Sequence, residues 1–494
     1  MYRKITYHDA VINDIFKNQD TKKLIIMIPA HNEENAIGNV LESILKQDKP
    51  CDETDIFIAL DNCVDNTEQV IQKHSNGLNV FTLETVNNKD RKAGALNQLY
   101  QLFFGNKESD QQPIEQIKNI NPKIQAFVGL DSDIYLGKDA LNILFNELNK
   151  EYKIGAVSAN YTCLMPEKPS KLPLNTPDRE LKLRIGKYSG AFGRFITFCQ
   201  NMEFSDWTIK QKYHHHIAEI NGGQCSMFRL DALKDIYDKQ KINGIYSNET
   251  DTEDLALTQD LRKLGWKCLI SDKARCYVDS MTTYKAFKAQ RTKWVSGTID
   301  YMLKSGLSTA YSRTLWLKEL GLLLNLIIRI LLVILVPSAI LLGHFVWNWV
   351  WILPVLAASV LNLIIALKTP NHRFIDVLLA FLDISPEIYL WITLRVHVGV
   401  WISEFKIDKE DGWAKQYQAE KGISKINWAP ILFLLLVILF AGILSYFKII
   451  TLNSALDVIK PFVNRGFDIL TDLTIVMLII MIFKLFKFRG NFSA

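Results

Sequence analysis

Two carboxylates, Asp131 and Asp133, follow directly after a small apolar run at residues 126–130. The run is bounded by polar residues and predicts a buried strand of a mostly parallel sheet. In an open α/β sheet, ligands bind beyond the carboxyl ends of the strands, where these two acids would lie. Carboxylate oxygens bind Mg²⁺ and Mn²⁺, and a cation held there could in turn hold a diphosphate. The alternative is that Asp131-Ser-Asp133 only forms a turn, because Asp and Ser both favour turns.

Other strand ends show the same pattern, so several polar side chains are expected at one edge of the sheet. Apolar runs at 24–30, 55–60 and 80–83 alternate with helical patterns, which predicts βαβ units, and Pro29 is expected to stop strand pairing. Lys92 stands at a predicted helix start, where free N–H groups and its ammonium would both attract a phosphate. The side chains after the first two runs are Asn32, Glu33 and Asp61. Together they indicate a nucleotide site, with acids on ribose hydroxyls and metal and the lysine on the diphosphate.

Residues further along the chain could complete this site. Gly222 and Gly223, in a turn before Gln224, would let the backbone approach a ligand closely. Glu253 and Asp254 stand where a helix is predicted to begin. An acid in that place often does no more than cap the helix, so the cap remains an alternative to a role in the site.

A third motif, Gln290-Arg-Thr-Lys-Trp294, lies on a predicted helix just before the apolar part of the chain. Gln290 and Trp294 are four residues apart and share one face of that helix. The alternative to a site role is an amphipathic helix at a membrane interface, with Trp294 as its anchor. Both interpretations can hold together.

Composition divides the chain into a polar part and an apolar part. The chain has 494 residues, of which 49% are hydrophobic, but long apolar runs dominate only from Leu320 onward. Residues 1–23 are polar and lack the apolar core of a signal peptide, so we expect the first part in the cytosol. Seven scattered cysteines fit reduced thiols there, without zinc spacing. The net charge of +5 is small, and we expect no nucleic-acid partner.

The apolar part predicts a membrane domain. Runs long enough to cross a bilayer lie at 320–346, 349–368, 429–448 and 467–487. Residues 374–403 carry several charges, so we expect an interfacial helix or a broken hairpin there. Lys and Arg concentrate in residues 285–318, in residues 404–426 and in the C-terminal tail, which predicts that these segments lie inside. We therefore expect a multi-pass protein of the plasma membrane with its N-terminal domain in the cytoplasm.

The order of the motifs resembles that of the family-2 inverting glycosyltransferases, over about residues 24–300. The matching motifs are Asp61-x-x-x-Asp65-x-Thr67, Lys92-x-Gly94-x-x-Asn97, Asp131-x-Asp133, Thr252-Glu-Asp254 and Gln290-Arg-x-Lys-Trp294. Each motif alone is weak, but all five in order before membrane spans form a specific signal. More closely, the chain resembles the membrane-embedded processive synthases, such as the hyaluronan, chitin, cellulose and poly-N-acetylglucosamine synthases.

The resemblance implies an α/β GT-A nucleotide-sugar-binding domain with a mostly parallel sheet, fused to an α-helical transmembrane domain. We place the GT-A domain at residues 1–284, interfacial helices at 285–318 and the transmembrane domain at 319–494. In the family, a pair of transmembrane helices usually precedes the catalytic domain, and here it is missing. We therefore expect that an accessory membrane subunit or a homo-oligomer could complete a channel.

The resemblance also implies roles for individual residues. In the family, the residues that match Asp61 and Lys92 bind the uridine and the diphosphate, and those that match Asp131 and Asp133 handle the diphosphate and its Mg²⁺ or Mn²⁺. The acid that matches Asp254 is the catalytic base. The element that binds the pyrophosphate and shapes the acceptor end matches Gln290, Arg291, Lys293 and Trp294. Lys293 replaces the usual Arg, so a point charge stands in place of a bidentate fork.

One further residue, Trp413, loosely matches a gating loop of hyaluronan-type synthases that closes over the nucleotide. Here the basic residue that follows it, Lys415, is one position closer than in that loop. The alternative is that Trp413 only anchors the chain at the membrane interface.

We therefore expect an inverting glycosyltransferase that uses a UDP-sugar, UDP-N-acetylglucosamine or UDP-glucose, to elongate an extracellular polysaccharide and pass it through the membrane. Its expected partners are the UDP-sugar, the growing glycan acceptor and membrane lipid. One alternative is a membrane glycosyltransferase that adds a single sugar to a lipid-linked or glycan acceptor. Another is a non-catalytic membrane protein that binds nucleotide sugars, against which Asp254 and the Asp131/Asp133 pair argue.

Overall fold

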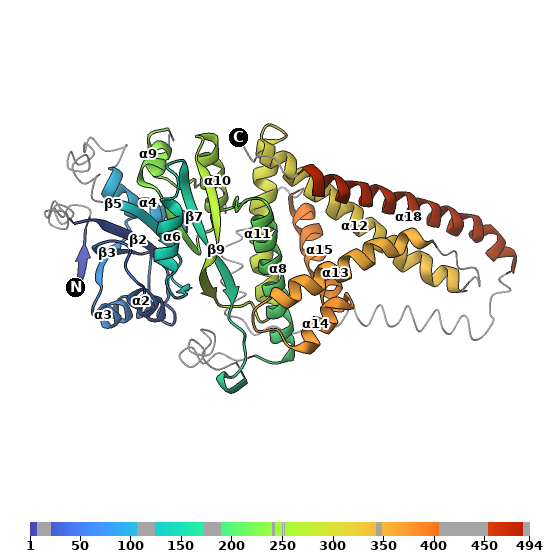
Figure 1. Cartoon of the computed structure of the whole chain (residues 1–494), viewed down its shortest axis with the longest axis horizontal. Helices are drawn as coiled ribbons and strands as arrows, with labels where there is room; N and C mark the ends of the chain where they lie inside the picture. Colours follow the sequence, from blue (N-terminus) through green and yellow to red (C-terminus); the bar gives the residue numbers. More distant parts are fainter. Residues whose placement is uncertain are drawn as a thin grey trace.

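The computed structural model describes residues 1–6, 21–105, 124–171, 189–239, 243–248, 250, 252–341, 348–404 and 453–487. Within these residues, an N-terminal α/β domain is followed by a group of long helices that extends away from it (Figure 1). The predicted span 429–448 and Trp413 lie outside the described residues.

The α/β domain contains one mixed sheet in the order β1–β4–β3–β2–β5–β8–β7–β9–β6. The strands are β1 (Tyr2–Ile5), β2 (Lys23–Ala30), β3 (Glu53–Leu60), β4 (Asn79–Glu84), β5 (Ile124–Leu130), β6 (Tyr135–Leu136), β7 (Ile154–Cys163), β8 (Cys225–Phe228) and β9 (Lys267–Val278). Neighbours from β1 to β5 run parallel, and β8 is antiparallel to both β5 and β7. The predicted α/β class with a mostly parallel sheet is confirmed.

Helices cover both faces of the sheet because its central strands are buried on both sides. Along β2, Ile25 and Met27 belong to one core and Leu24, Ile26 and Ile28 to the other. The first core is closed by α4 (Arg91–Phe104), α9 (Leu230–Lys239) and α10 (Glu253–Lys263). The second is closed by α2 (Ile37–Leu45), α3 (Thr67–His74) and α6 (Ala140–Leu148). Each fully buried Leu or Ile side chain contributes about 1.5–3 kcal/mol to folding.

Strand β2 corrects one detail of the sequence prediction, because it continues through Pro29 to Ala30. Pro29 is paired in register with Ala59 of β3, whereas pairing with β5 on the other side ends at Met27. A proline has no N–H to donate, and beyond Met27 the β5 side of the strand requires none. Pro29 can therefore sit at the carboxyl end of a central strand.

The described helices that do not belong to these two cores are mostly long. They are α8 (Ala191–Tyr213), α11 (Tyr284–Ser305), α12 (Ala310–Leu341), α13 (Ile352–Lys368), α14 (Phe374–Phe381), α15 (Ile384–Glu404) and α18 (Asn453–Lys487). In the described part of the chain, Ala310–Ile340 and Trp349–Lys368 are long and apolar enough to cross a membrane. The α14–α15 pair, which is bent by 69°, would make a third span if it is counted as one. The predicted span 467–487 lies along α18.

Two charged residues at the break between α14 and α15 and in α15 have partners on neighbouring helices. Asp383, at the break between the two helices, accepts hydrogen bonds from Asn362 Nδ2 at 2.6 Å and from the Ser359 hydroxyl at 3.0 Å. Glu387 forms an ion pair with Arg329 of α12 at 2.7 Å. The predicted break in this segment is therefore present. Paired charges cost less in a membrane than isolated ones, which weakens the charge argument against a third span.

Candidate functional site

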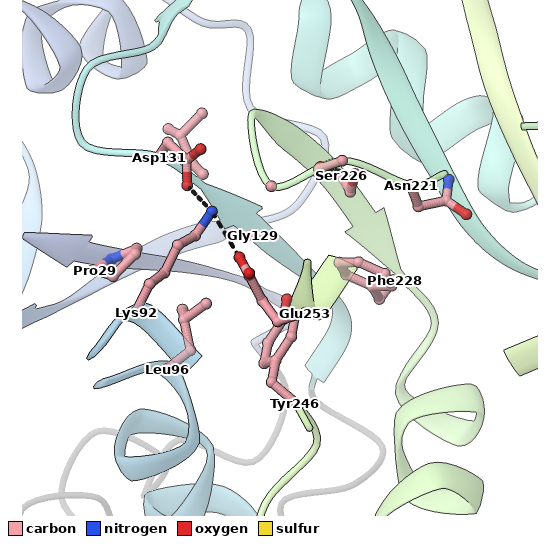
Figure 2. A pocket seen from close by; sticks show the side chains of 13 residues that line it. Pro29, Lys92, Leu96, Gly129, Asp131, Asn221, Ser226, Phe228, Tyr246 and Glu253 are labelled. Carbon is pink, nitrogen blue, oxygen red and sulfur yellow. Dashed lines mark hydrogen bonds and ion pairs between the residues drawn. The ribbon is translucent and has the colours of Figure 1, made fainter. Parts of the chain in front are cut away.

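A small cleft lies at the carboxyl end of β5, where α4, the turn before β8 and the start of α10 meet (Figure 2). Residues from several segments distant in sequence line it: Pro29, Lys92, Leu96, Gly129, Leu130, Asp131, Asn221, Gly222, Gly223, Ser226, Phe228, Tyr246 and Glu253. Its position at the ends of the strands is the one that the sequence predicts for a ligand site.

Lys92 is at the centre of this cleft and is held between two acids (Figure 2). Its Nζ lies 2.6 Å from Asp131 Oδ1 and 3.2 Å from Glu253 Oε1. Burial by itself would lower the pKa of Lys92, but the charges of Asp131, Glu253 and Asp254 outweigh it and raise that pKa. Lys92 is therefore a permanent positive charge that joins α4 to β5 and α10.

Asp254 follows Glu253 at the start of α10 and has two backbone donors. The Leu255 N–H donates to its Oδ1 at 2.8 Å, and the Gly223 N–H donates to its Oδ2 at 3.3 Å. The first bond ties the carboxylate to the next N–H in the first turn of α10, whose N-cap residue is Thr252, whereas the second turns Oδ2 toward the cleft. Burial, followed by the neighbouring charge of Glu253, raises the pKa of Asp254 to about 6. Asp254 can therefore exchange a proton near neutral pH.

The turn that contains Gly222 and Gly223 passes so close to Lys92 and Asp131 that a side chain at Gly223 would displace the Lys92 ammonium. A Cβ on Gly223 would lie 2.2 Å from Lys92 Nζ and 3.3 Å from Asp131 Oδ1. The turn is anchored by Asn221, whose Nδ2 donates to the Ser158 hydroxyl at 2.7 Å and to the Leu269 carbonyl at 2.9 Å. The backbone here approaches side chains of the site closely, and its predicted close approach to a ligand stays a prediction. Gln224, also singled out from the sequence, follows in this turn.

Helix α11 brings Lys293 to the same cluster. A Cβ on Gly297 would lie 2.3 Å from Thr252 Cγ2, so the helix passes directly beside the start of α10. Burial lowers the pKa of Lys293 to about 8, an effect that the charge of Glu253 opposes and that of Lys92 assists. Glu253 is itself buried, yet Lys92 and Lys293 hold its pKa below the usual range.

The residues that the sequence predicts to bind the nucleotide sugar after β2 and β3 lie in the two loops that follow these strands. Asp61 accepts three hydrogen bonds on one oxygen, Oδ1, from Thr85, Asn88 and Asn62. Asn32, with a left-handed φ of 56°, accepts the Val64 N–H at 2.8 Å. The Glu33 N–H donates to the Thr67 hydroxyl at 2.7 Å. These bonds tie the two loops together and fix the Asp61 carboxylate at the sheet edge.

The side chains of Asp131 and Asp133 offer hard oxygen ligands for a divalent cation. The Oδ1 atom of Asp131 already forms an ion pair with Lys92, and the Asp133 side chain is exposed. The described residues contain no group of three or more His, Cys, Asp or Glu side chains that could hold a metal ion. A cation here would therefore take few protein ligands and complete its shell with phosphate oxygens and water, as Mg²⁺ does at nucleotide sites. The residues fit such an ion.

The residues of the motif on α11 lie in two different environments. The sequence groups Arg291 with the donor-binding residues, but its buried guanidinium instead contacts Glu203 on α8 and Tyr389 on α15. It also stacks over the Trp294 ring, at 4.4 Å from the ring centre. Gln290 and Trp294 are half-buried. The rotation of the helix thus turns Lys293, and not Arg291, to the acids, and the donor-binding role of Arg291 stays a prediction.

Three residues of this arrangement escape the sequence reasoning. Tyr246 lines the cleft and is held by Asn97. The Tyr246 N–H donates to Asn97 Oδ1 at 2.8 Å, and Asn97 Nδ2 donates to the Tyr246 carbonyl at 2.8 Å. Asn97 belongs to the Lys92-x-Gly94-x-x-Asn97 motif, which is the signal that could have identified it. Glu203 lies in a long helix without such a signal.

Comparison with known families agrees with this geometry. Residues 22–297, more than half of the chain, match the family described as Glycosyltransferase like family 2. The match covers β2 to β9 and ends within α11, so it contains every described element that contributes to the cleft.

Curated relatives are distant. The chain is 22% identical over 302 residues to a poly-beta-1,6-N-acetyl-D-glucosamine synthase of Staphylococcus epidermidis, which is 60% of this chain and 60% of the relative. It is 22% identical over 291 residues to the synthase of that name in Staphylococcus aureus, with 58% of this chain and 57% of the relative covered. These matches span less than two thirds of the relatives' length. A solved mannosyltransferase of Pyrobaculum calidifontis, in complex with GDP-Man and Mn²⁺, aligns over 93% of this chain and 86% of its own, at 14% identity and a TM-score of 0.37.

Proposed function

Because the chain belongs to glycosyltransferase family 2, we propose that it is an inverting transferase that takes its sugar from a UDP-sugar. In this proposal it is a processive synthase, which elongates a polysaccharide and passes the product through the membrane. The relatives that it resembles are named poly-beta-1,6-N-acetyl-D-glucosamine synthases, which favours UDP-N-acetylglucosamine over UDP-glucose as donor.

One observation supports this proposal above the others: a carboxylate with a raised pKa stands beside a lysine-centred ion cluster. Asp254 Oδ2 faces the Gly223 turn, and Lys92 bridges Asp131 and Glu253 in the same cleft. A sugar transfer needs a base for the acceptor and positive charge for the leaving diphosphate. The cluster places candidates for both within one site.

The proposed reaction is a single displacement. Asp254 removes the proton from the acceptor hydroxyl as that oxygen attacks C1 of the donor sugar, while the bond from C1 to the diphosphate oxygen breaks. The oxygen–C1 bond forms on the face opposite the leaving group, so the configuration at C1 inverts. The raised pKa makes Asp254 a stronger base than an exposed aspartate.

Lys92 and Lys293 are the groups proposed to hold the diphosphate. Three carboxylates, Asp131, Glu253 and Asp254, share the cluster with these two ammonium groups, so the cluster has no surplus of positive charge. Asp131 and Asp133 would hold Mg²⁺ or Mn²⁺ there, and such an ion supplies Lewis-acid stabilisation of the diphosphate charge. Asp61, Asn32 and Glu33, at the neighbouring strand ends, are proposed to bind the nucleoside.

The membrane part of the proposal rests on the helices that follow the family match. Ala310–Ile340 and Trp349–Lys368 could cross a bilayer. Residues 285–318 carry seven Lys and Arg residues just before them, which favours a plasma-membrane protein with its catalytic domain in the cytoplasm. The growing glycan and membrane lipid are the further partners in this proposal, and an accessory subunit or a second copy could complete a channel.

Product length tests the proposal. The full chain in lipid would be supplied with Mn²⁺ and a panel of UDP-sugars, and UDP release and product mass would be measured. We expect release with UDP-N-acetylglucosamine and a ladder of products. A single-sugar adduct would instead support the non-processive transferase, and no UDP release from any donor would support a non-catalytic binding protein.

The pH dependence of kcat/KM is expected to be bell-shaped, with limbs near the two shifted pKa values. Asp254 must lose its proton to act as base, so kcat/KM should rise with pH through about 6. Lys293 must keep its proton to attract the diphosphate, so kcat/KM should fall above about 8. Lys293→Arg keeps the charge and should move only the alkaline limb upward. The kcat/KM for UDP release would be measured against pH for the parent and for Lys293→Arg. If both proteins lose activity at the same alkaline pH, Lys293 does not bind the donor.

Asp133→Ala is expected to weaken UDP binding in Mn²⁺ by about tenfold or more, because a cation with few protein ligands loses one of them. Isothermal titration calorimetry with UDP and Mn²⁺ measures this change. The same titration in EDTA is the internal control, and there the variant and the parent should bind UDP equally. Equal affinity in Mn²⁺ would leave Asp131-Ser-Asp133 as a turn without a metal role.

A further inference from the structure

A partly buried polar triad includes Arg291 of the motif on α11. Arg291 Nη2 donates to Glu203 Oε2 on α8 at 2.6 Å and to the Tyr389 hydroxyl on α15 at 3.2 Å. The Tyr389 hydroxyl in turn donates to the same Glu203 oxygen at 2.6 Å. The triad thus joins three helices whose bonded residues are 88, 98 and 186 positions apart. A charged pair at this depth is held in one geometry by its hydrogen bonds.

Arg291 also supports the ring of Trp294. Its guanidinium carbon lies 4.4 Å from the centre of that ring and 5.1 Å from the centre of the Phe287 ring. The Phe287 ring is in turn 5.4 Å from the ring of Tyr389. Trp294 has Trp207 of α8 as a further neighbour, at 6.4 Å between ring centres. The position of Trp294 therefore depends on where the triad holds Arg291.

Helix geometry places Arg291 and Trp294 on a different side of α11 from Lys293, which is proposed to bind the diphosphate of the donor. Arg291 and Trp294 are three residues apart and share a side of α11, whereas Lys293 is two residues, or about 200° around the axis, from Arg291. Lys293 has its electrostatic interactions with Glu253, Lys92, Asp254 and Asp131. Helix α11 thus turns Lys293 to the acids, and it turns Trp294 to Arg291, which is held by residues of α8 and α15.

We propose that Tyr389 is a positioning residue for sugar transfer, which acts through Glu203 and Arg291 to hold Trp294. This inference rests on the proposed transferase function. In this proposal Trp294 borders the acceptor, so α15, the longer helix of the bent pair that follows α13, sets the position of the acceptor through this contact. Loss of the Tyr389 hydroxyl frees Arg291 to shift, and an acceptor misplaced by a fraction of an ångström reacts more slowly. The diphosphate contacts remain.

The test is Tyr389→Phe in the full chain in lipid, with labelled UDP-N-acetylglucosamine as the probe. UDP release, free sugar and label in product would be measured over a range of donor concentrations. We expect kcat for transfer to fall about tenfold, the size of one hydrogen bond to a charged group, with donor KM unchanged within about twofold. The fraction of donor hydrolysed should rise, because a displaced acceptor leaves C1 open to water.

Two further variants make the test specific. Tyr301→Phe is the matched control, since it removes a buried hydroxyl from α11 that makes no hydrogen bond within the described residues. Its transfer rate and its hydrolysed fraction should equal those of the parent. Glu203→Gln should reproduce the kcat loss, and the double variant Glu203→Gln/Tyr389→Phe should lose less than the product of the two, because both changes break one shared bond.

A Tyr389→Phe protein with the parent's kcat and hydrolysed fraction would overturn the proposal, as would additive effects in the double variant. A loss that appears in donor KM instead of kcat would also overturn it, because the triad would then act on the donor. If the parent releases no UDP from any UDP-sugar, the proposed function itself fails, which is a distinct result.

Discussion

Replacing Asp254 by Asn is expected to lower sugar transfer by about 10²–10⁴-fold, the contribution of a well-placed general base. Asn keeps the volume of the side chain and can still accept a backbone N–H, but it cannot take the proton of the acceptor. Removal of one negative charge beside Lys92 should leave UDP affinity unchanged or slightly higher, because a diphosphate would then meet less repulsion. Single-turnover transfer and UDP calorimetry on the same sample measure both quantities.

Asp260→Asn is the matched control for this variant. Asp260 lies on the same helix, α10, and forms a partly exposed ion pair with Lys263 at 2.8 Å. Surface pairs of this kind contribute little, so the control should keep the parent's turnover. An Asp254→Asn protein with near-full turnover would show that Asp254 only caps α10 and that the base is another group.

Replacing Lys92 by Met is expected to abolish UDP binding and to destabilise the fold. The change keeps the length of the side chain but leaves Asp131 and Glu253 without their shared partner in the cleft. Loss of one member of a buried ion pair costs about 3–5 kcal/mol, because the remaining charges are uncompensated. Metal-free UDP titration and thermal unfolding would measure the two effects, and Lys89→Met, at an exposed position in the loop before α4, is the control.

The destabilisation should depend on pH with a definite sign. The pKa of Asp131 is already raised by burial, while Lys92 opposes that rise and holds the pKa of Glu253 low. Without Lys92, the folded-state pKa of Asp131 rises further above its unfolded value, and the pKa of Glu253 rises from its lowered value. A raised carboxyl pKa contributes stability at low pH that is lost as pH rises through it. The deficit in melting temperature should therefore be smaller at pH 5 than at pH 8, and an equal deficit at both would contradict the account.

The sequence predicts the sheet edge well because strand ends are local features. Asp61 and Asp131 each follow directly after a short apolar run, and parallel pairing brings the ends of such runs together. Lys92 and Asp254 were placed at helix starts by equally local signals. The positions of these residues therefore required only the periodicity of short segments and the rule for ligand sites in α/β sheets.

Helix rotation and long-range packing could not be predicted in the same way. The motif on α11 contains Arg291 and Lys293 two residues apart, and the sequence alone does not say which of them faces the acids. The answer depends on Glu203 and Tyr389, 88 and 98 positions away from Arg291. Strand β7 (Ile154–Cys163) and strand β9 (Lys267–Val278), which carry no motif, were also absent from the prediction.

The anomeric configuration of the product tests the central claim most directly. A single displacement at C1, with Asp254 as base, inverts the configuration that the sugar has in the donor. The full chain in lipid would be incubated with an α-linked UDP-sugar and Mn²⁺, and the linkage formed would be read by NMR of the purified product. We expect β linkages, and we expect them to disappear in the Asp254→Asn protein. An α-linked product, or transfer that continues undiminished without the Asp254 carboxylate, would contradict it.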